Sequence, residues 1–216
     1  MRIVPRIALV AVVSVLLCVG ALRIYSRQLK GRAETVLRES YELSTGKRVP
    51  TLGDLRQRFG TELKQPDPCT ASGCKYEIML SNRALARLHL APYTALSSSF
   101  WVRDDLVQEN DLSLWTVNRQ GRMMVAYVDA KYCEGCKGFD VVPCEGFVAS
   151  LASGSIMIGF GSEPKEKRTA FGFDPSCLTS FQGCAGIPDL APALWRGTAS
   201  GALQCTTAGQ QVVLAQ

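Results

Sequence analysis

Residues 7–22 read IALVAVVSVLLCVGAL, a run of 16 residues without a charged side chain. About 18 or more apolar residues are typical of a transmembrane helix, and about 10–14 are typical of a signal-peptide core. The run resumes at Ile24 after Arg23, whose long side chain can reach the lipid headgroups. The stretch therefore predicts an uncleaved membrane anchor over residues 1–25, with the lipid bilayer as a partner of residues 7–25.

Two other interpretations of the run stay open. A cleaved signal peptide is the first, because the small residues Val19 and Ala21 suit a signal-peptidase site. A buried helix of a soluble protein is the second. A lipoprotein is disfavoured, because Leu17 stands before Cys18 where a small residue would be needed.

The positive charge of the chain lies beside this run. The formal net charge is +5, but six of the 24 Lys and Arg residues precede the first acidic residue, Glu34. Residues 33–216 therefore carry 18 basic and 19 acidic side chains. A nucleic-acid-binding domain is expected to carry a basic stripe, so we expect no nucleic-acid partner.

Two rules predict opposite orientations for the anchor. Two basic residues precede the run and four follow it, which favours a cytoplasmic body. Cysteine usage favours the other side, because eight cysteines outside the run and a single histidine suit an oxidising compartment. The charge rule is weak for long downstream domains. We therefore predict a single-pass membrane protein with an extracytoplasmic body.

The eight cysteines of the body are candidates for structural disulfides. They are Cys69, Cys74, Cys133, Cys136, Cys144, Cys177, Cys184 and Cys205. Cys69 and Cys74 enclose a short Thr-Ala-Ser-Gly turn and are most simply a local pair, and Cys177 with Cys184 is a candidate for a second one. The full connectivity stays open, because sequence alone does not choose among the pairings.

The motif Cys133-Glu-Gly-Cys136 is the sharpest chemical signal in the chain. Two cysteines at this spacing can carry out thiol–disulfide exchange when a helix N-terminus lowers the pKa of the first thiol. Gly138 and Pro143 interrupt the stretch where that helix should begin. We therefore keep catalysis by Cys133 and Cys136 as an alternative and expect a structural role for both residues.

A zinc site built from Cys133, Cys136, Cys177 and Cys184 is a further alternative. Structural zinc sites usually show two tight Cys-x-x-Cys pairs, whereas Cys177 and Cys184 are separated by six residues. We therefore predict no metal and no cofactor.

Other catalytic groups are sparse. His89 is the only histidine, so every Ser-His-Asp or Cys-His mechanism would depend on it. It lies between two leucines in an expected helix, where a packed or half-exposed histidine is ordinary. Asp104 and Asp105 are adjacent, so their side chains diverge on a strand or solvate a turn. The chain thus leans towards a non-enzymatic role.

The segment 183–195 mixes apolar residues with turn formers. It could form a groove for a protein partner with Trp195 as an anchor. The simpler expectation is that Leu190, Leu194 and Trp195 pack down over the edge of the sheet.

The hydrophobic pattern predicts helices first, then strands, then short helices. The first expected helix, 32–43, either continues the anchor as a stalk or docks on the body. The second runs from Thr51 to Gly60 with a capping box to Asp54, and the third covers 83–90 with Asn82 as its cap. Two more are expected, one that starts near Pro175 after Asp174 and one over 188–195. The expected strands are 74–81, one around 100–103, a hairpin of 112–117 with 122–128, a hairpin of 155–160 with 168–173, and 212–214, with a cysteine-rich connection over 132–146.

This pattern predicts an α+β fold: a transmembrane helix, then one domain with an antiparallel sheet and peripheral short helices. A β-sandwich is the main rival. The expected division is an anchor over 1–25, a helical stalk or linker over 26–50, a cysteine-rich domain over 51–196, and an uncharged tail over 197–216. An apolar helix leading to a sheet also suits a pilus-like subunit, although the run lacks the early acidic residue of such subunits. We therefore predict a membrane-anchored binding or envelope-assembly domain, with thiol–disulfide exchange as the alternative.

Overall fold

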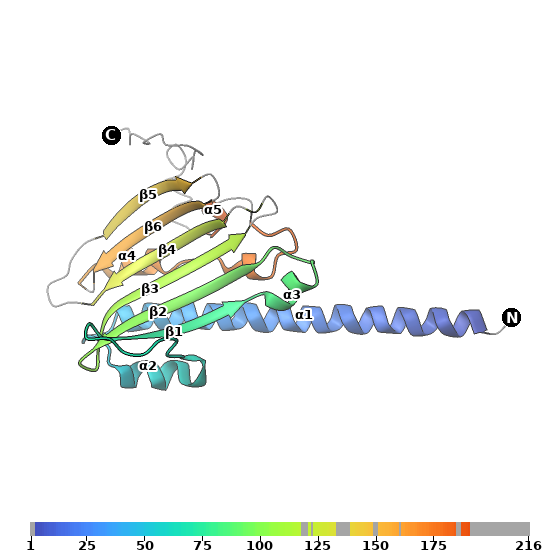
Figure 1. Cartoon of the computed structure of the whole chain (residues 1–216), viewed down its shortest axis with the longest axis horizontal. Helices are drawn as coiled ribbons and strands as arrows, with labels where there is room; N and C mark the ends of the chain where they lie inside the picture. Colours follow the sequence, from blue (N-terminus) through green and yellow to red (C-terminus); the bar gives the residue numbers. More distant parts are fainter. Residues whose placement is uncertain are drawn as a thin grey trace.

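The protein consists of a long helix that leads to a body built on one sheet (Figure 1). The structure is a computed structural model, and it describes residues 3–117, 121, 123–132, 139–148, 151–159, 161–184 and 187–190. The helices and 3₁₀ turns are α1 (Ile3–Ser44), α2 (Leu52–Phe59), η1 (Gly60–Glu62), α3 (Arg83–Arg87), α4 (Pro164–Ala170), η2 (Pro175–Leu178) and α5 (Ile187–Leu190). The strands are β1 (Cys74–Ser81), β2 (Thr94–Arg103), β3 (Leu106–Val117), β4 (Met123–Lys131), β5 (Phe139–Val148) and β6 (Leu151–Gly159).

The six strands form a mixed sheet in the order β1-β2-β3-β4-β6-β5. All neighbours are antiparallel except β4 and β6, which are parallel. The chain leaves β4, forms the outer strand β5 and returns as β6, so β6 runs in the same direction as β4. The expected α+β class is confirmed, but the sheet is mixed rather than antiparallel. The described strands form one sheet, so a sandwich is not confirmed.

The hairpin predicted over 112–117 and 122–128 is confirmed as β3 and β4. Val117 lies opposite Met123, and the same register extends to Glu109 opposite Lys131. The preceding turn joins β2 to β3 through Asp104 and Asp105, whose φ angles are 51° and 63°. Positive φ at both central residues suits a two-residue hairpin turn, which aspartate tolerates better than most residues.

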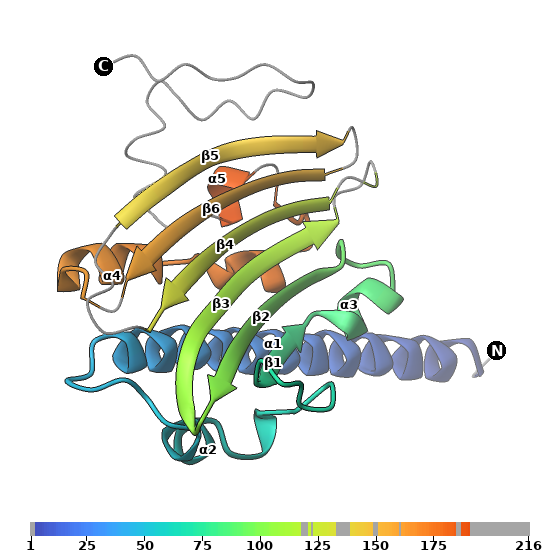
Figure 2. The same cartoon turned by 60° about the vertical axis from the view of Figure 1, so that its left-hand side comes forward.

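One face of the sheet packs against α1 and the later short helices (Figure 2). Alternate residues of β1, β3 and β4 point to this face, as the period of two requires. The expected face of β1 is confirmed, because Tyr76, Ile78 and Leu80 are buried. The largest side chains buried from the central strands are Leu96, Phe100, Leu112 and Leu114. The core therefore lies between the sheet and the helices on this face.

The second half of α1 is part of this core. Leu29, Ala33, Val36 and Leu37 are buried and follow the i, i+4, i+7, i+8 spacing of one helix face. Of the two alternatives for the segment 32–43, the structure has the docked one. The residues expected as a stalk or linker therefore contribute directly to the hydrophobic core.

The helix predicted between Thr51 and Gly60 is confirmed as α2. Asp54 Oδ2 accepts a hydrogen bond of 2.7 Å from the Thr51 backbone N–H, and Thr51 Oγ1 accepts one of 3.2 Å from the Asp54 N–H. This is a capping box, and the backbone hydrogen bond from Thr51 lowers the pKa of Asp54. Gly60, with φ of 52°, ends the helix, and the Phe59 ring packs 5.5 Å from that of Phe100.

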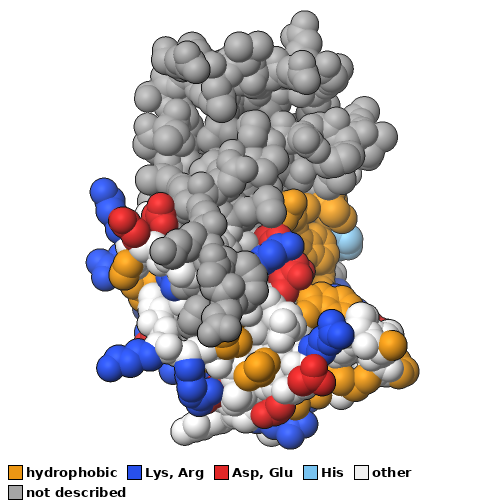
Figure 3. Space-filling model, turned by 90° about the vertical axis from the view of Figure 1, so that its left-hand side faces the viewer, with side chains coloured by type: hydrophobic (Ala, Val, Ile, Leu, Met, Phe, Trp, Pro, Cys, Tyr) orange, Lys and Arg blue, Asp and Glu red, His pale blue; other side chains and the backbone are white. Residues whose placement is uncertain are grey.

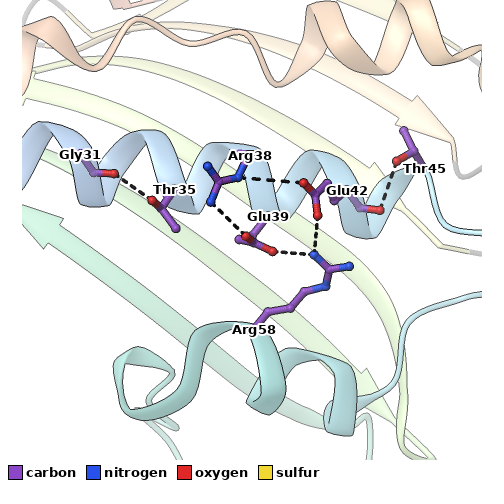
Figure 4. A network of polar contacts seen from close by, with 7 residues as sticks. All are labelled: Gly31, Thr35, Arg38, Glu39, Glu42, Thr45 and Arg58. Carbon is purple, nitrogen blue, oxygen red and sulfur yellow. Dashed lines mark hydrogen bonds and ion pairs between the residues drawn. The ribbon is translucent and has the colours of Figure 1, made fainter.

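Ion pairs hold α2 against the docked half of α1 (Figure 4). Arg58 donates to Glu39 and, at 2.8 Å, to Glu42. These bonds raise the pKa of Arg58, with the bond to Glu42 as the largest cause. Arg32 of α1 contacts Glu62 of η1 at 2.6 Å. Charged side chains of α1 therefore also contribute to its packing against α2 and η1.

Two predictions near the end of β1 are corrected by the structure. The helix expected over 83–90 ends at Arg87, and the Asn82 side chain makes no capping hydrogen bond. Its Nδ2 donates to the Pro92 carbonyl oxygen and its Oδ1 accepts from the Thr94 N–H, both at 2.8 Å. Asn82 therefore closes the loop between β1 and β2, because both ends of that loop lie beside it.

The expected hairpin of 155–160 with 168–173 is wrong. Residues 151–159 form β6, which pairs with β4 and β5, and residues 164–170 form α4. Pro164 occupies the first turn of α4, and Glu163 and Glu166 form a capping box there. Pro at this position and a reciprocal cap are strong helix signals, and they outweigh the alternating pattern after Arg168.

Several predictions in the last third of the chain are tested only in part. The connection expected over 132–146 contains β5, so it is wrong as a continuous loop. The start near Pro175 is confirmed as the 3₁₀ turn η2, in which Asp174 Oδ1 accepts from the Ser176 N–H at 3.0 Å. Helix α5 spans Ile187–Leu190 and so overlaps the expected helix 188–195 at residues 188–190, while 191–195 lie outside the described residues. The expected strand 212–214 and the tail 197–216 lie outside the described residues.

Candidate functional site

The first half of α1 exposes a large apolar surface. Among the described residues, one helix is long and apolar enough to span a membrane, and it is this one. Val15, Leu16 and Leu17 are 60%, 65% and 69% exposed. Exposed apolar surface of this extent marks a membrane or protein contact. With the disulfides of the body, the helix fits a single-pass, membrane-anchored protein.

The length of this half matches a bilayer. A helix rises 1.5 Å per residue, so the segment from Ile3 to Leu22 extends about 30 Å, which is the thickness of a typical hydrocarbon core. A hydrogen bond to the body follows just after this segment, where the Tyr25 hydroxyl donates to the Ser81 carbonyl oxygen at 3.1 Å. The exposed half of α1 is therefore long enough to span a bilayer without burying the sheet.

A buried lysine ties the other end of α1 to the body. Lys167 of α4 is 5% exposed, and its Nζ donates to the Ser44 carbonyl oxygen at 2.6 Å. Burial lowers the pKa of Lys167. A cation at the carboxyl end of a helix satisfies a terminal carbonyl and opposes the helix dipole. The docked half of α1 is thus fastened at Tyr25 and again at Ser44.

Two disulfides lie in the described part of the body. Cys69 bonds to Cys74 with a Cα–Cα distance of 4.3 Å, and Cys177 bonds to Cys184 with a Cα–Cα distance of 5.6 Å. These are the two local pairs that the spacing favoured. The first closes an exposed turn, whereas both cysteines of the second are buried, and Cys177 belongs to η2, which packs against α1.

The other cysteines of the body are not placed by the structure. Cys133, Cys136 and Cys205 lie outside the described residues, and of Cys144 only the backbone, in β5, is described. The exchange motif is therefore untested, whereas the four-cysteine zinc alternative is wrong, because the disulfide leaves Cys177 and Cys184 without a thiolate to bind zinc. Cys18, on the exposed half of α1, is a free thiol.

The single histidine and the expected partner segment are placed in part. His89 follows α3 with φ of 56° and is exposed, so it lies in a turn rather than in the expected helix. Leu190 is fully buried, as expected if this segment packs on the sheet. Leu194 and Trp195 lie outside the described residues.

The outer face of the sheet carries an acidic cluster that the sequence interpretation missed. Oxygen atoms of Glu109, Asp111 and Asp129 all lie within 4.8 Å of one another. Asp111 is directly opposite Asp129 in the β3–β4 register, and Glu109 is two residues along the same strand. Lys131 approaches Asp129 at 3.6 Å.

Burial and mutual repulsion shift the titration of this cluster. Burial raises the pKa of Glu109, and the charges of Asp129 and Asp111 raise it further, against the effect of Lys131. Burial also raises the pKa of Asp111, with a second contribution from Asp129, against Lys75 and Lys131. Carboxylate oxygens suit hard cations, but the two lysines already supply counter-charge. The cluster by itself assigns no reaction.

Comparisons with protein-family models, curated proteins and solved structures found no match for this chain.

Proposed function

We propose that this protein is a single-pass, membrane-anchored extracytoplasmic domain, stabilised by disulfides, that acts in binding or envelope assembly. The observation that carries the proposal is the division of α1. Its first half exposes apolar side chains around the helix, and its second half buries one face in the core of the body. A helix of this kind couples a membrane anchor rigidly to a folded domain.

The disulfides support an extracytoplasmic body. Disulfides persist in oxidising compartments and are rare in the cytosol. Cys177 and Cys184 are both buried in the hydrophobic core, so this bond belongs to the folded core and not to a peripheral loop. The basic residues that follow the apolar run favour the opposite orientation, but that rule is weak for long domains.

The placement of polar groups favours binding or assembly over catalysis. His89 is exposed on a turn, and the three clustered carboxylates are flanked by lysines on the outer face of the sheet. General acid–base catalysis needs a titratable group positioned towards a bound substrate. Neither feature provides that arrangement by itself.

The test is thiol labelling of the full chain in cells. A membrane-impermeant maleimide is applied to intact and to permeabilised cells, with and without prior reduction, and labelled cysteines are identified by mass spectrometry. The Cys18→Ser variant is the control, because it removes the thiol of the anchor and leaves only body cysteines. We expect body cysteines to react in intact cells only after reduction.

Two results would contradict the proposal. Body cysteines that react freely without reductant would show that the disulfides do not form. Labelling that needs permeabilisation as well as reduction would place the body in the cytoplasm.

A different measurement distinguishes thiol–disulfide exchange by Cys133 and Cys136 from a structural role of these two cysteines. An oxidoreductase has one reactive thiolate of lowered pKa. The Cys133→Ser variant would then lose exchange with a model disulfide substrate. If the cysteines are structural, the variant loses stability and the parent chain shows no such exchange.

Within envelope assembly, the architecture also suits a pilus-like subunit. The exposed half of α1 can pack either with lipid or with the same half of other copies. Cys18 lies on that half and is a free thiol, so it reports on close approach. Oxidative crosslinking in membranes would yield a dimer through Cys18 if the helices pack together, and the Cys18→Ser variant would abolish it. A monomer at every protein density would exclude this form of assembly.

A further inference from the structure

The end of the body nearest the exposed half of α1 carries exposed apolar side chains. Leu88, Leu90 and Phe181 are 59%, 38% and 51% exposed, and α3 lies at this end (Figure 1). We use the name rim for these three residues together with Arg83 and Arg87 of α3. Exposed apolar residues scattered singly are normal, but a group at one level of the structure is informative.

Phe181 marks the depth of the rim along α1. Phe181 and Thr179 line a cleft of about 560 Å³ together with Val19, Leu22 and Arg23 of α1. Val19 and Leu22 belong to the uncharged apolar run. Because Phe181 lines the same cleft, it lies at the level where the apolar run ends and the first arginine follows.

The loop after α3 lies at the same level. Gly183 packs so closely on this loop that an added Cβ would be 2.6 Å from Pro92 Cγ. Asn82 also holds Pro92 through its side-chain hydrogen bond, and the neighbouring Ser81 accepts from Tyr25 of α1. The two loops that carry the exposed apolar residues are therefore side by side.

The charged side chains of the α1 segment and of the β1–β2 loop at the rim are all basic. Residues 19–33 and 82–93 contain no Asp or Glu. Arg23 and Arg27 of α1 line the Phe181 cleft, and Arg83 and Arg87 are exposed one turn apart on α3. The opposite end of the body instead shows both signs interspersed (Figure 3). Asp174 and Asp189 line the next cleft, beyond Gly183, so the basic part of this level lies at α1 and α3, where it indicates an anionic counterpart.

We infer that the rim rests on the surface of the bilayer that α1 spans. Leu88, Leu90 and Phe181 enter the headgroup–acyl boundary, and the arginines bind the phosphates of anionic lipids. Interfacial binding combines these two contributions, buried apolar area and attraction of basic residues to anionic lipids. This inference rests on the proposed anchor, and the rim then fixes the tilt of the body as well as its distance from the membrane.

The test measures the depth of introduced tryptophans in the full chain. The variants Leu88→Trp and Phe181→Trp are reconstituted into phosphatidylcholine–phosphatidylglycerol vesicles, with and without lipids brominated near the glycerol end of the acyl chains. Leu106→Trp is the matched control, because Leu106 is an exposed leucine, 42% accessible, at the β2–β3 turn. The parent chain supplies the background of its three native tryptophans.

We expect bromolipid to quench the added emission of Leu88→Trp and Phe181→Trp by about half or more, and to leave that of Leu106→Trp unchanged. All three variants should resist extraction by alkaline carbonate. If the two rim variants behave like Leu106→Trp while the chain stays in the membrane, the rim inference is wrong and the anchor stands. If carbonate releases the chain, the anchor itself is wrong.

The charge contribution is tested separately. In the Leu88→Trp background, Arg83→Gln with Arg87→Gln should reduce quenching in vesicles that contain phosphatidylglycerol and have little effect in pure phosphatidylcholine. An equal effect in both lipids would contradict headgroup binding by these arginines. Quenching that is lost as protein density rises would indicate that a second copy, and not lipid, covers the rim.

Discussion

The two halves of α1 share one helical geometry but bury their apolar side chains in different ways. Residues 11–22 carry no charged side chain on any side of the helix, and they are exposed in the isolated chain except for the half-buried Gly20 and Leu22. Residues 29–44 are apolar along one stripe, with Glu39 and Glu42 on the charged side. A helix that is apolar all round needs lipid or other helices, whereas a one-sided helix needs a sheet. The change of pattern therefore marks where the proposed membrane ends and the body begins.

The most direct test of this difference makes the same substitution, Leu→Ala, in each half of α1. Leu37→Ala removes a side chain that is 7% exposed, and a buried Leu→Ala change costs about 2–5 kcal/mol. Leu17→Ala removes a side chain that is 69% exposed, so the free energy of unfolding of the body should stay within about 0.5 kcal/mol of that of the parent chain. Urea unfolding of both variants in one detergent, followed by near-ultraviolet circular dichroism, measures the difference. Equal losses would contradict the division of α1.

The two disulfides compare a bond beside the docked half with one remote from it. Loop-closure entropy alone gives each short loop about 2 kcal/mol. The paired change Cys177→Ser with Cys184→Ser should cost more stability than Cys69→Ser with Cys74→Ser. The first pair is buried, with Cys177 in the η2 turn that packs on α1, and the second closes an exposed turn. Thermal unfolding of both double variants tests the order. A larger loss for the exposed turn would show that the packing beside α1 contributes little.

The end of the docked half is tested at Lys167. In Lys167→Met the Ser44 carbonyl oxygen loses a charged donor at 2.6 Å, and a hydrogen bond to a charged group contributes about 1.5–3 kcal/mol. Removing a buried charge offsets part of this, so we expect a loss of about 1 kcal/mol. Lys165→Met is the matched control on the exposed side of α4. If both variants unfold at the same urea concentration, the contact does not fasten α1.

The smallest expected effect on stability comes from a substitution on the face of the sheet that α1 does not touch. Unlike the changes above, this substitution should stabilise the body. The pKa values of Glu109 and Asp111 are raised in the folded state, so the folded protein binds more protons than the unfolded chain above pH 4. Its stability therefore falls as the pH rises through the raised values. Asp111→Asn should stabilise the body by about 0.5 kcal/mol at pH 7 and lose this advantage near pH 4.

Asp105→Asn, in the exposed β2–β3 turn, is the control for this pH dependence. Chemical unfolding at both pH values should show a pH-dependent gain only for Asp111→Asn. A gain that persists at pH 4 would assign the effect to something other than charge repulsion.

Local signals in the sequence predicted local structure well. The capping box of Thr51 and Asp54 and the alternation of Tyr76, Ile78 and Leu80 each involve residues close together in the chain. Their physical causes are a hydrogen bond within one turn and a period of two. Such causes act before any long-range contact forms, and sequence reasoning can identify them.

Long-range pairing was not predictable in the same way. The parallel contact of β4 with β6 depends on β5 taking the edge position, and no short pattern encodes that choice. The acidic cluster was within reach in part, because the predicted hairpin joins the strands of Asp111 and Asp129, but their opposition depends on a register that the sequence did not assign. The helix α4 was also within reach, since Pro164 and Glu166 carry ordinary helix-start signals.

Peptide-resolved hydrogen exchange of the full chain in lipid nanodiscs, recorded at increasing urea, tests the division of α1 most directly. We predict that amides of 29–44 lose protection together with those of β2 and β3, while amides of 11–22 stay protected by the bilayer. If residues 29–44 stay protected after the sheet has unfolded, or residues 11–22 exchange together with the sheet, the helix does not divide its apolar surface between membrane and body.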